Sequence, residues 1–209
     1  MSGGDASFAP IAGHSVGGLL DALAAKQPVP GGGAAAGLVL ATAAGLGSMV
    51  LRYSVGKKAF AEWNHELEQA LETCDRLRLE AIAAADADAA AYGELSSLWK
   101  LAEDDPARIA RWKPAVEAAI AAPRSAMLLA ATLLEVLEAL PERTSKSIRS
   151  DLAIAAILAD GAMRSAAWNV RINLPLLGDP AAASLEDAAI GDQLAEFRAR
   201  AEAIEVKCR

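Results

Sequence analysis

The chain has 209 residues, a net charge of −7 and two cysteines, Cys74 and Cys208. This length suits one domain with a substantial core, so we expect a single domain over residues 1–209. The acidic balance argues against nucleic acid as the main partner. Two distant cysteines form neither a disulfide framework nor a metal-ligand spacing. No basic region precedes a long apolar core at the N-terminus, so we expect no export signal and a cytoplasmic protein.

Alanine supplies much of the 54% hydrophobic content, whereas aromatic residues make up only 4%. Such a composition favours helices, and no segment shows the alternation of a strand. We therefore predict an all-α fold, a helical bundle with long helices. In chain order, helices are expected over 14–27, 34–53, about 59–103, from 106, from Pro123 to 140, over 151–174 and from 184. Two of these helices are nearly charge-free or alanine-stacked, more than a monomer usually buries, so a homodimer is expected.

The stretch from Pro28 to Gly33 reads Pro-Val-Pro-Gly-Gly-Gly and precedes a charge-free segment that ends at Leu51. The prolines restrict the backbone, and the glycines leave amides open to a ligand. Small residues then recur four apart on one helix face, at Gly33, Gly37, Ala41 and Gly45. Another helix can approach that face closely, and the helix start presents free amides to an anion or polar group. A merely flexible turn stays an alternative, while the scarcity of Leu, Ile and Phe argues against a membrane span.

Polar side chains near two later helix ends are candidates for chemistry. Ser150-Asp151 opens an apolar helix, where such a pair also serves as a cap or a first-turn acid. Asn169 and Asn173 are four apart and share a face, while Arg171 points elsewhere. If buried, the two carboxamides need partners, either a ligand or a neighbouring helix.

Three further features have simpler interpretations. Lys57-Lys58 follows a glycine break, but most adjacent lysines are only solvated. Asp86 and Asp88 lie in an alanine tract with Tyr92 four residues after the second, and we expect an exposed helix face there. The two histidines have no acidic or cysteine neighbours that indicate a metal site or a catalytic triad.

Four of these motifs, taken in order, resemble the C-terminal family of the formiminotransferase-cyclodeaminases, which includes methenyltetrahydrofolate cyclohydrolases. The matching motifs are Pro28 to Gly33, Gly56-Lys57-Lys58-Ala59-Phe60, Ser150-Asp151 and Asn169-Val170-Arg171-Ile172-Asn173. Their order and separations agree over about residues 15–180. The chain departs from the family at Ala34, where serine is usual, and at Thr144-Ser145-Lys146-Ser147, where Gly-Asn-x-Asn is typical.

The resemblance implies a helical homodimer or larger homo-oligomer, with a folate bound near the subunit interface. It implies one-carbon chemistry on a tetrahydrofolate substrate, with no further cofactor, metal, nucleic acid or membrane. The two expected reactions are hydrolysis of 5,10-methenyltetrahydrofolate to 10-formyltetrahydrofolate and closure of 5-formiminotetrahydrofolate with release of ammonia. A non-catalytic folate- or pterin-binding dimer, which the loop around Ser145 and Ser147 favours, and an enzyme for another cyclic amidine stay open.

The resemblance also assigns roles to residues. Asp151 and Lys57 are expected to be catalytic, with the Asp151 carboxylate beside the amidinium cation. Lys57, Lys58 and Arg171 are expected near the glutamate carboxylates of the folate. The other expected ligand contacts are Gly31, Gly32, Gly33, Ser150, Asn169 and Asn173. In this interpretation the glycine turn forms one wall of a single pocket with the catalytic pair.

Overall fold

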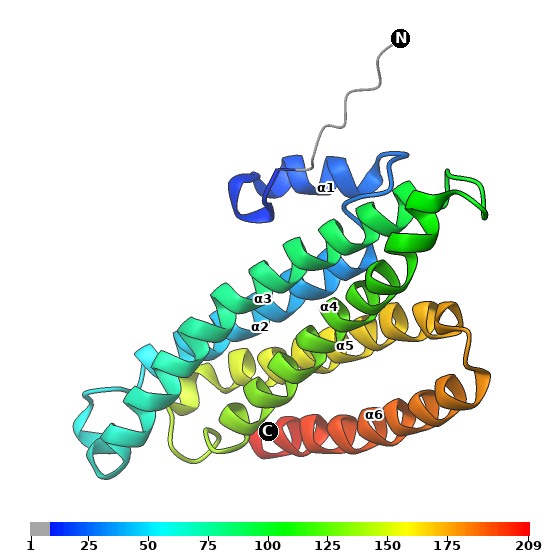
Figure 1. Ribbon diagram of the computed structural model, residues 1–209. Coiled ribbons are helices and arrows are strands. Elements are labelled where there is room, and N and C mark those ends of the chain that lie inside the picture. Colours follow the sequence, from blue (N-terminus) through cyan, green and yellow to red (C-terminus); the bar gives the residue numbers. More distant parts are fainter. Residues whose placement is uncertain (1–8) are drawn as a thin grey trace.

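The computed structural model describes residues 9–209, and Figure 1 shows their arrangement. Four long helices pack in a ring in which each contacts the next and the last contacts the first. They are α2 (Gly32–Arg52), α3 (Asn64–Leu98), α4 (Pro106–Glu138) and α5 (Arg149–Asn173). The described residues contain no strand, so the prediction of an all-α helical bundle is confirmed.

Two more helices lie outside the ring (Figure 1). α6 (Pro180–Cys208) packs mainly on α5, and α1 (Val16–Ala24) lies against α2 and α3 through the buried side chain of Leu19. Short 3-10 turns precede or join the helices: η1 (Ile11–Gly13), η2 (Lys58–Trp63), η3 (Lys146–Ile148) and η4 (Leu174–Leu177).

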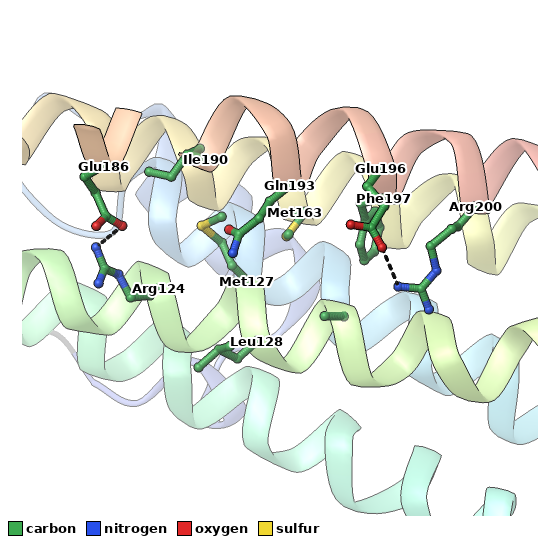
Figure 2. Close-up of a pocket in the computed structure, with 11 residues that line it drawn as sticks. Arg124, Met127, Leu128, Met163, Glu186, Ile190, Gln193, Glu196, Phe197 and Arg200 are labelled. Carbon is green, nitrogen blue, oxygen red and sulfur yellow. Dashed lines mark hydrogen bonds and ion pairs between the residues drawn. The ribbon is translucent and has the colours of Figure 1, made fainter. Parts of the chain in front are cut away.

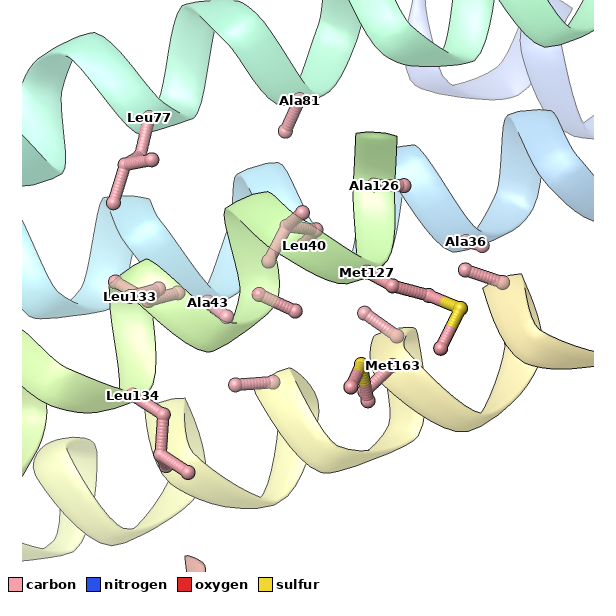
Figure 3. Close-up of a cluster of buried hydrophobic side chains, with 14 of the residues drawn as sticks. Ala36, Leu40, Ala43, Leu77, Ala81, Ala126, Met127, Leu133, Leu134 and Met163 are labelled. Atoms are coloured by element: carbon pink, nitrogen blue, oxygen red, sulfur yellow. The ribbon is translucent and has the colours of Figure 1, made fainter. Parts of the chain in front are cut away.

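The core is built from leucines set among alanines (Figure 3). Leu40 of α2, Leu77 of α3 and Leu133 of α4 are fully buried and point into the space between the helices. Most buried positions of α2 are alanine or glycine, as the sequence predicts. Small side chains bring the helix axes close, so each leucine contacts several neighbours at once.

The small face of α2 lies directly on α3. A Cβ atom added at Gly37 would lie 2.6 Å from the Cβ of Ala85 and 2.8 Å from the carbonyl oxygen of Ala81. No side chain fits in that space without moving one of the two helices. The predicted close helix contact is therefore confirmed at this position.

α4 is a single helix, and the prediction that Pro123 begins a new helix is wrong. A proline inside a helix has no N–H group, which leaves the carbonyl oxygen four residues earlier without its donor. Here that oxygen belongs to Ala119, and the Nδ2 of Asn173 in α5 donates to it at 2.9 Å. Because a neighbouring helix replaces the missing hydrogen bond, the helix continues through the proline.

Other helix ends differ by a few residues from the prediction. α1 begins after Ser15, whose side chain accepts from the amide of Gly18 at 3.1 Å. α6 begins before Ser184, because Asp179 caps its first turn and Pro180 suits the first helical position. α5 begins at Arg149, so Ser150 and Asp151 lie inside its first turn rather than at the cap.

α2 and α4 are long and apolar enough to cross a membrane, judged by length and composition alone. Within the bundle, 61% of the most apolar window of α2 is buried against other helices. Core helices of soluble proteins pass the same test, so this finding is weak evidence for a span. The absence of a membrane partner stays a prediction.

Candidate functional site

A cavity of about 310 Å³ lies where α2 begins and α5 ends. α3 and α4 continue past the cavity to the turn that joins them. α2 and α5 are shorter and terminate at the cavity. The lining residues come from all four helices and from the turn before α2: Pro28, Val29, Gly31, Gly32, Gly33, Asp88, Tyr92, Ala119, Asn169, Ile172 and Asn173. The structure thus brings the glycine turn together with both predicted asparagines.

The glycine turn leaves the start of α2 without a side-chain cap. Gly31 occupies the cap position, and its carbonyl oxygen accepts the first helical hydrogen bond from Ala35 at 3.1 Å. The amides of the first turn have no partner within the helix, because an α-helix always leaves its first amides free. These amides and the positive end of the helix dipole border the cavity, as predicted.

Gly33 is required by the position of Asp88 on α3. A Cβ atom at Gly33 would lie 1.9 Å from the Oδ2 of Asp88, so the carboxylate occupies the space where a side chain would be. Gly32 differs, because its added Cβ would make an ordinary contact with the Oδ1 of Asn169 at 3.5 Å. Only the third glycine of the turn is therefore fixed by contact with the cavity wall.

Asp88 is the acid of this cavity. Among residues 9–209, no hydrogen bond or ion pair involves its carboxylate, and burial raises the pKa of Asp88 to about 6. Such a group exchanges a proton readily near neutral pH. The prediction of an exposed face at Asp88 is wrong. Asp86 has a different role, since its Oδ1 accepts from the amide of Ile11 at 2.8 Å and holds the N-terminal segment.

The sequence leaves open whether Asn169 and Asn173 bond to a ligand or to a neighbouring helix, and the structure gives each a different partner. Asn173 is buried, and its Nδ2 donates to Ala119 of α4 and to the carbonyl oxygen of Asn169 at 3.0 Å. Asn169 donates only within its own helix, to Ser165 at 3.1 Å. Asn173 therefore makes the helix-to-helix hydrogen bond, while Asn169 keeps its side-chain oxygen near the start of α2.

Four of the remaining predicted residues lie at the opposite end of the bundle: Lys57, Lys58, Ser150 and Asp151. α2 separates the glycine turn from Lys57 by about 30 Å, given a rise of 1.5 Å per residue. Lys57, Lys58 and Ser150 are exposed, and Asp151 is half-buried. Their two segments meet there, because the amide of Ser145 donates to the Oγ of Ser54 at 3.1 Å. A single chain does not form the one pocket that the sequence interpretation assigned to all these residues. We call this region the lysine end and the cavity the glycine end.

Arg171 belongs to neither end. Its guanidinium pairs with Asp187 of α6 and lies 6.0 Å from the ring of Trp168. It faces a separate shallow hollow beside α6, which agrees with the expectation that it points away from the two asparagines. In this chain, Arg171 joins α5 to α6.

A second groove, of about 260 Å³, runs between α4, α5 and α6 (Figure 2). Its floor is apolar, with Met127, Met163 and Phe197, and charged pairs stand at both ends. Arg124 pairs with Glu186 at one end, and Arg200 binds Glu138 through two hydrogen bonds near the other. The pKa of Glu138 is lowered, chiefly by its hydrogen bond to Arg200. The groove offers no unpaired acid comparable to Asp88. Nor do residues 9–209 hold three side chains grouped as metal ligands.

Comparison with known proteins identifies the family. The family model for formiminotransferase-cyclodeaminase matches residues 15–191. The chain belongs to this family. Its 34% identity with the methenyltetrahydrofolate cyclohydrolase of Methylorubrum extorquens extends over 78% of this chain and 80% of that protein. The resemblance seen in the sequence motifs is confirmed.

Two more comparisons define how the family fold is shared. The formimidoyltransferase-cyclodeaminase of Gallus gallus is 26% identical over 78% of this chain, which corresponds to 31% of that relative's length. A crystal structure of formiminotetrahydrofolate cyclodeaminase from Thermotoga maritima matches with a TM-score of 0.78 and 25% identity, covering 95% of each chain. The chain therefore spans about a third of the length of the Gallus gallus relative and nearly all of the chain in the Thermotoga maritima structure.

Proposed function

We propose that the chain is a tetrahydrofolate one-carbon enzyme. It hydrolyses 5,10-methenyltetrahydrofolate to 10-formyltetrahydrofolate, or closes 5-formiminotetrahydrofolate with release of ammonia. The relative with 34% identity carries the name of the first activity, and the matching crystal structure that of the second. The observation that carries the proposal is the half-buried, unpartnered carboxylate of Asp88 facing the cavity of the glycine end.

Hydrolysis needs a base and a negative group beside a cation. Water adds to the carbon between the two nitrogens of the methenyl bridge, and the Asp88 carboxylate takes the proton that the water loses. The bond from this carbon to N5 then breaks, N5 receives the proton held by Asp88, and the added hydroxyl releases its own proton to water as the formyl C=O forms on N10. The ionised carboxylate also stabilises the amidinium charge of the substrate.

Ring closure uses the same group in a similar order. N10 attacks the carbon of the protonated formimino group and gives its proton to Asp88, and that proton then reaches the departing NH2 group, which leaves as ammonia and leaves the methenyl cation. Both reactions pass through a tetrahedral carbon between two nitrogens. One residue that gives and takes a proton near neutral pH serves both, and the folate derivative is the substrate with no further cofactor.

In a homodimer, the lysine end of one copy contributes to the site of the other copy. The exposed face of α5 carries an apolar stripe along its whole length, at Ile154, Ile157, Trp168 and Ile172. Trp168 and Ile172 are 69% and 71% exposed, and a Cβ added at Gly161 in the middle of this stripe would meet nothing within 4 Å. Two copies paired antiparallel about Gly161 bury the stripe against itself. The lysine end of one copy then lies beside the glycine end of the other, so Asp151 and Lys57 reach the cavity of the partner.

The activity is tested with purified protein and 5,10-methenyltetrahydrofolate, by following the loss of near-ultraviolet absorbance. A parallel assay uses 5-formiminotetrahydrofolate. Turnover of either substrate supports the proposal. Binding without turnover indicates instead the non-catalytic folate-binding dimer, and neither binding nor turnover indicates an enzyme for another cyclic amidine.

The shared site is tested by mixing two inactive variants, Asp88→Asn and Asp151→Asn. In a shared site, each mixed dimer keeps one cavity with both carboxylates. Random mixing should therefore restore about a quarter of the wild-type rate, since half of the dimers are mixed and each has one of two sites intact. Light scattering establishes the dimer. A dimer that regains no activity on mixing, or a monomer that is fully active, contradicts the shared site.

A further inference from the structure

The core-facing side of α3 continues past the cavity of the glycine end. Asp88, Tyr92 and Trp99 follow at intervals of four and seven residues, on the same helix side as the buried Leu77 and Ala81. α2 and α5 terminate at the level of Asp88, so α4 is the one long helix of the ring that lies alongside the later residues. Tyr92 is 39% exposed there, so its ring is accessible to a ligand.

α4 presents a matching side. Ala119, which lines the cavity, is followed towards the start of the helix by Trp112 and Arg108, at intervals of seven and four residues. Both helices continue from the level of the cavity to the turn that joins them, and Figure 1 shows that turn at one end of the α3–α4 pair. Together the two matching sides extend the wall of the cavity along the two longer helices.

Contacts between the rings make this extension continuous. The ring centroids of Tyr92 and Trp99 are 6.1 Å apart, and those of Trp99 and Trp112 are 6.3 Å apart, both edge to face. The guanidinium of Arg108 lies 4.9 Å from the centre of the Trp112 ring. Trp99 is nevertheless 43% exposed. We call these four residues, Tyr92, Trp99, Trp112 and Arg108, the aromatic ledge.

Arg108 is held in place, but not all of its N–H donors have a partner. Its side chain is only 17% exposed, and one Nη1–H donates to the carbonyl oxygen of Leu101 at 2.9 Å. The Nη2 lies 4.0 Å from the Oε1 of Glu103, whose own side chain is almost wholly exposed. A guanidinium has five N–H donors, so a carboxylate arriving along the ledge would still find donors in a fixed orientation.

We propose that the aromatic ledge binds the benzoyl-glutamate arm of the folate substrate. The benzoyl ring packs against Tyr92 and Trp99, and a glutamate carboxylate meets Arg108. The proposal rests on the proposed function, which places the one-carbon bridge beside Asp88. Trp99, the residue that caps the end of α3, lies eleven positions after Asp88, about 16 Å away at 1.5 Å per residue, a span suited to an aromatic ring, an amide and a glutamate.

The ledge thereby gives one chain both the reacting bridge and the arm of its substrate. Lys57 and Lys58, the residues expected from the sequence to meet the glutamate, lie about 30 Å from the cavity of the same chain. An aromatic side chain is also better suited than a lysine to a benzoyl ring, because ring stacking adds to the buried apolar area.

The test compares two substrates in three variants. One substrate is 5,10-methenyltetrahydrofolate, and the other is an analogue with a methyl group on N10 in place of the arm. Trp99→Leu and Arg108→Met should each raise KM for the complete substrate about tenfold while leaving kcat nearly unchanged. Neither should alter KM for the truncated analogue. Arg111→Met is the matched control, because Arg111 pairs with Glu94 away from the ledge, and it should change neither value.

A fluorescence titration separates failure of the ledge from failure of the enzyme. Quenching of tryptophan emission by the complete substrate, lost in Trp99→Leu and absent with the truncated analogue, supports the ledge even if no turnover occurs. Turnover with KM values that Trp99→Leu and Arg108→Met leave unchanged, or change equally for both substrates, overturns the ledge and leaves the proposed function standing. Circular dichroism confirms that each variant keeps its helices.

Discussion

The two ends of the α2–α5 pair differ in how far the chain alone completes them. At the glycine end, the start of α2, the side of α3 and the end of α5 enclose a cavity with an unpartnered acid. At the lysine end, Lys57, Lys58 and Ser150 are exposed. Both ends carry family motifs, yet among residues 9–209 only the glycine end has a carboxylate whose pKa is raised by burial, to about 6. A sequence motif indicates where a reaction is expected. Burial by neighbouring helices determines which nearby side chain has a pKa suited to proton transfer.

The largest expected effect tests the acid of the glycine end. Asp88→Asn should lower kcat by about 10²- to 10⁴-fold, the usual contribution of a positioned proton-transfer group. Asp86→Asn is the control, because the Asp86 carboxylate only holds the amide of Ile11, and it should keep most of the rate. Steady-state rates on both folate substrates measure the effect. Equal losses in the two variants would show that α3, and not the Asp88 carboxylate, is what matters.

The next largest effect concerns the glycine that makes room for this acid. Gly33→Ala places a Cβ atom where the Asp88 carboxylate lies, so the carboxylate must move by an ångström or more. Such a displacement costs about a hundredfold in rate. Gly32→Ala should be nearly silent, because its Cβ would make an ordinary contact with Asn169. Rates and melting temperatures of both variants decide the point, and a silent Gly33→Ala would contradict the placement of Asp88.

A stability effect follows from the hydrogen bond between Asn173 and the carbonyl oxygen of Ala119. Asn173→Leu leaves this buried oxygen without a donor and should lower the free energy of unfolding by about 1–3 kcal/mol. In a Pro123→Ala background the helix supplies its own N–H, so the same substitution should cost clearly less. Urea unfolding of the four proteins in this cycle measures the difference. If the losses in unfolding free energy of the two single variants add up exactly to that of the double variant, Asn173 does not compensate for the N–H that Pro123 lacks.

The dependence of stability on pH gives another test of Asp88. Its pKa is about 6 in the folded chain against 3.8 for an ordinary aspartate, so the folded state holds the proton more tightly. The ionised carboxylate therefore destabilises the fold fully above pH 6, and this cost disappears as the pH falls from about 6 to 3.8. Asp88→Asn should be more stable than the wild type at pH 7.5, by on the order of 1–3 kcal/mol. The two stabilities should converge near pH 4, and a variant less stable at pH 7.5 would contradict the assigned burial.

The smallest expected effect belongs to the lysine end. Lys57 is exposed, and its Nζ lies 5.7 Å from the centre of the Tyr53 ring. Lys57→Met should change the free energy of unfolding by less than about 0.5 kcal/mol. Its turnover should nevertheless fall if the dimer carries Lys57 into the partner's cavity. A thermal melt and a rate measurement on the same sample separate the two, and a large loss of stability would give Lys57 a structural role within its own chain.

Much of the fold follows from local sequence patterns. The charge-free run predicts a helix over 34–53, and α2 spans Gly32–Arg52, because glycine, proline and apolar spacing act within a few residues. The prediction of a helix start at Pro123 is wrong because the donor that lets α4 continue comes from α5, far away in the sequence. The repeated side-chain interval from Leu77 through Ala81 to Asp88 is a signal that could have placed Asp88 facing inward. The raised pKa of Asp88 could not be predicted, since it depends on how closely α2 packs on α3.

The uncharged surface of α2 also has a consequence during synthesis. Its most apolar window has a mean hydropathy of 1.9, and α5, which covers one side of it, begins only at Arg149. Ribosomes add about 5–20 residues per second, so roughly five to twenty seconds pass before that cover exists. α3 follows at once and shields the small-residue face, while the other face stays open to chaperones and membrane-targeting factors. The chain is most at risk of aggregation or mistargeting before its fourth long helix has left the ribosome.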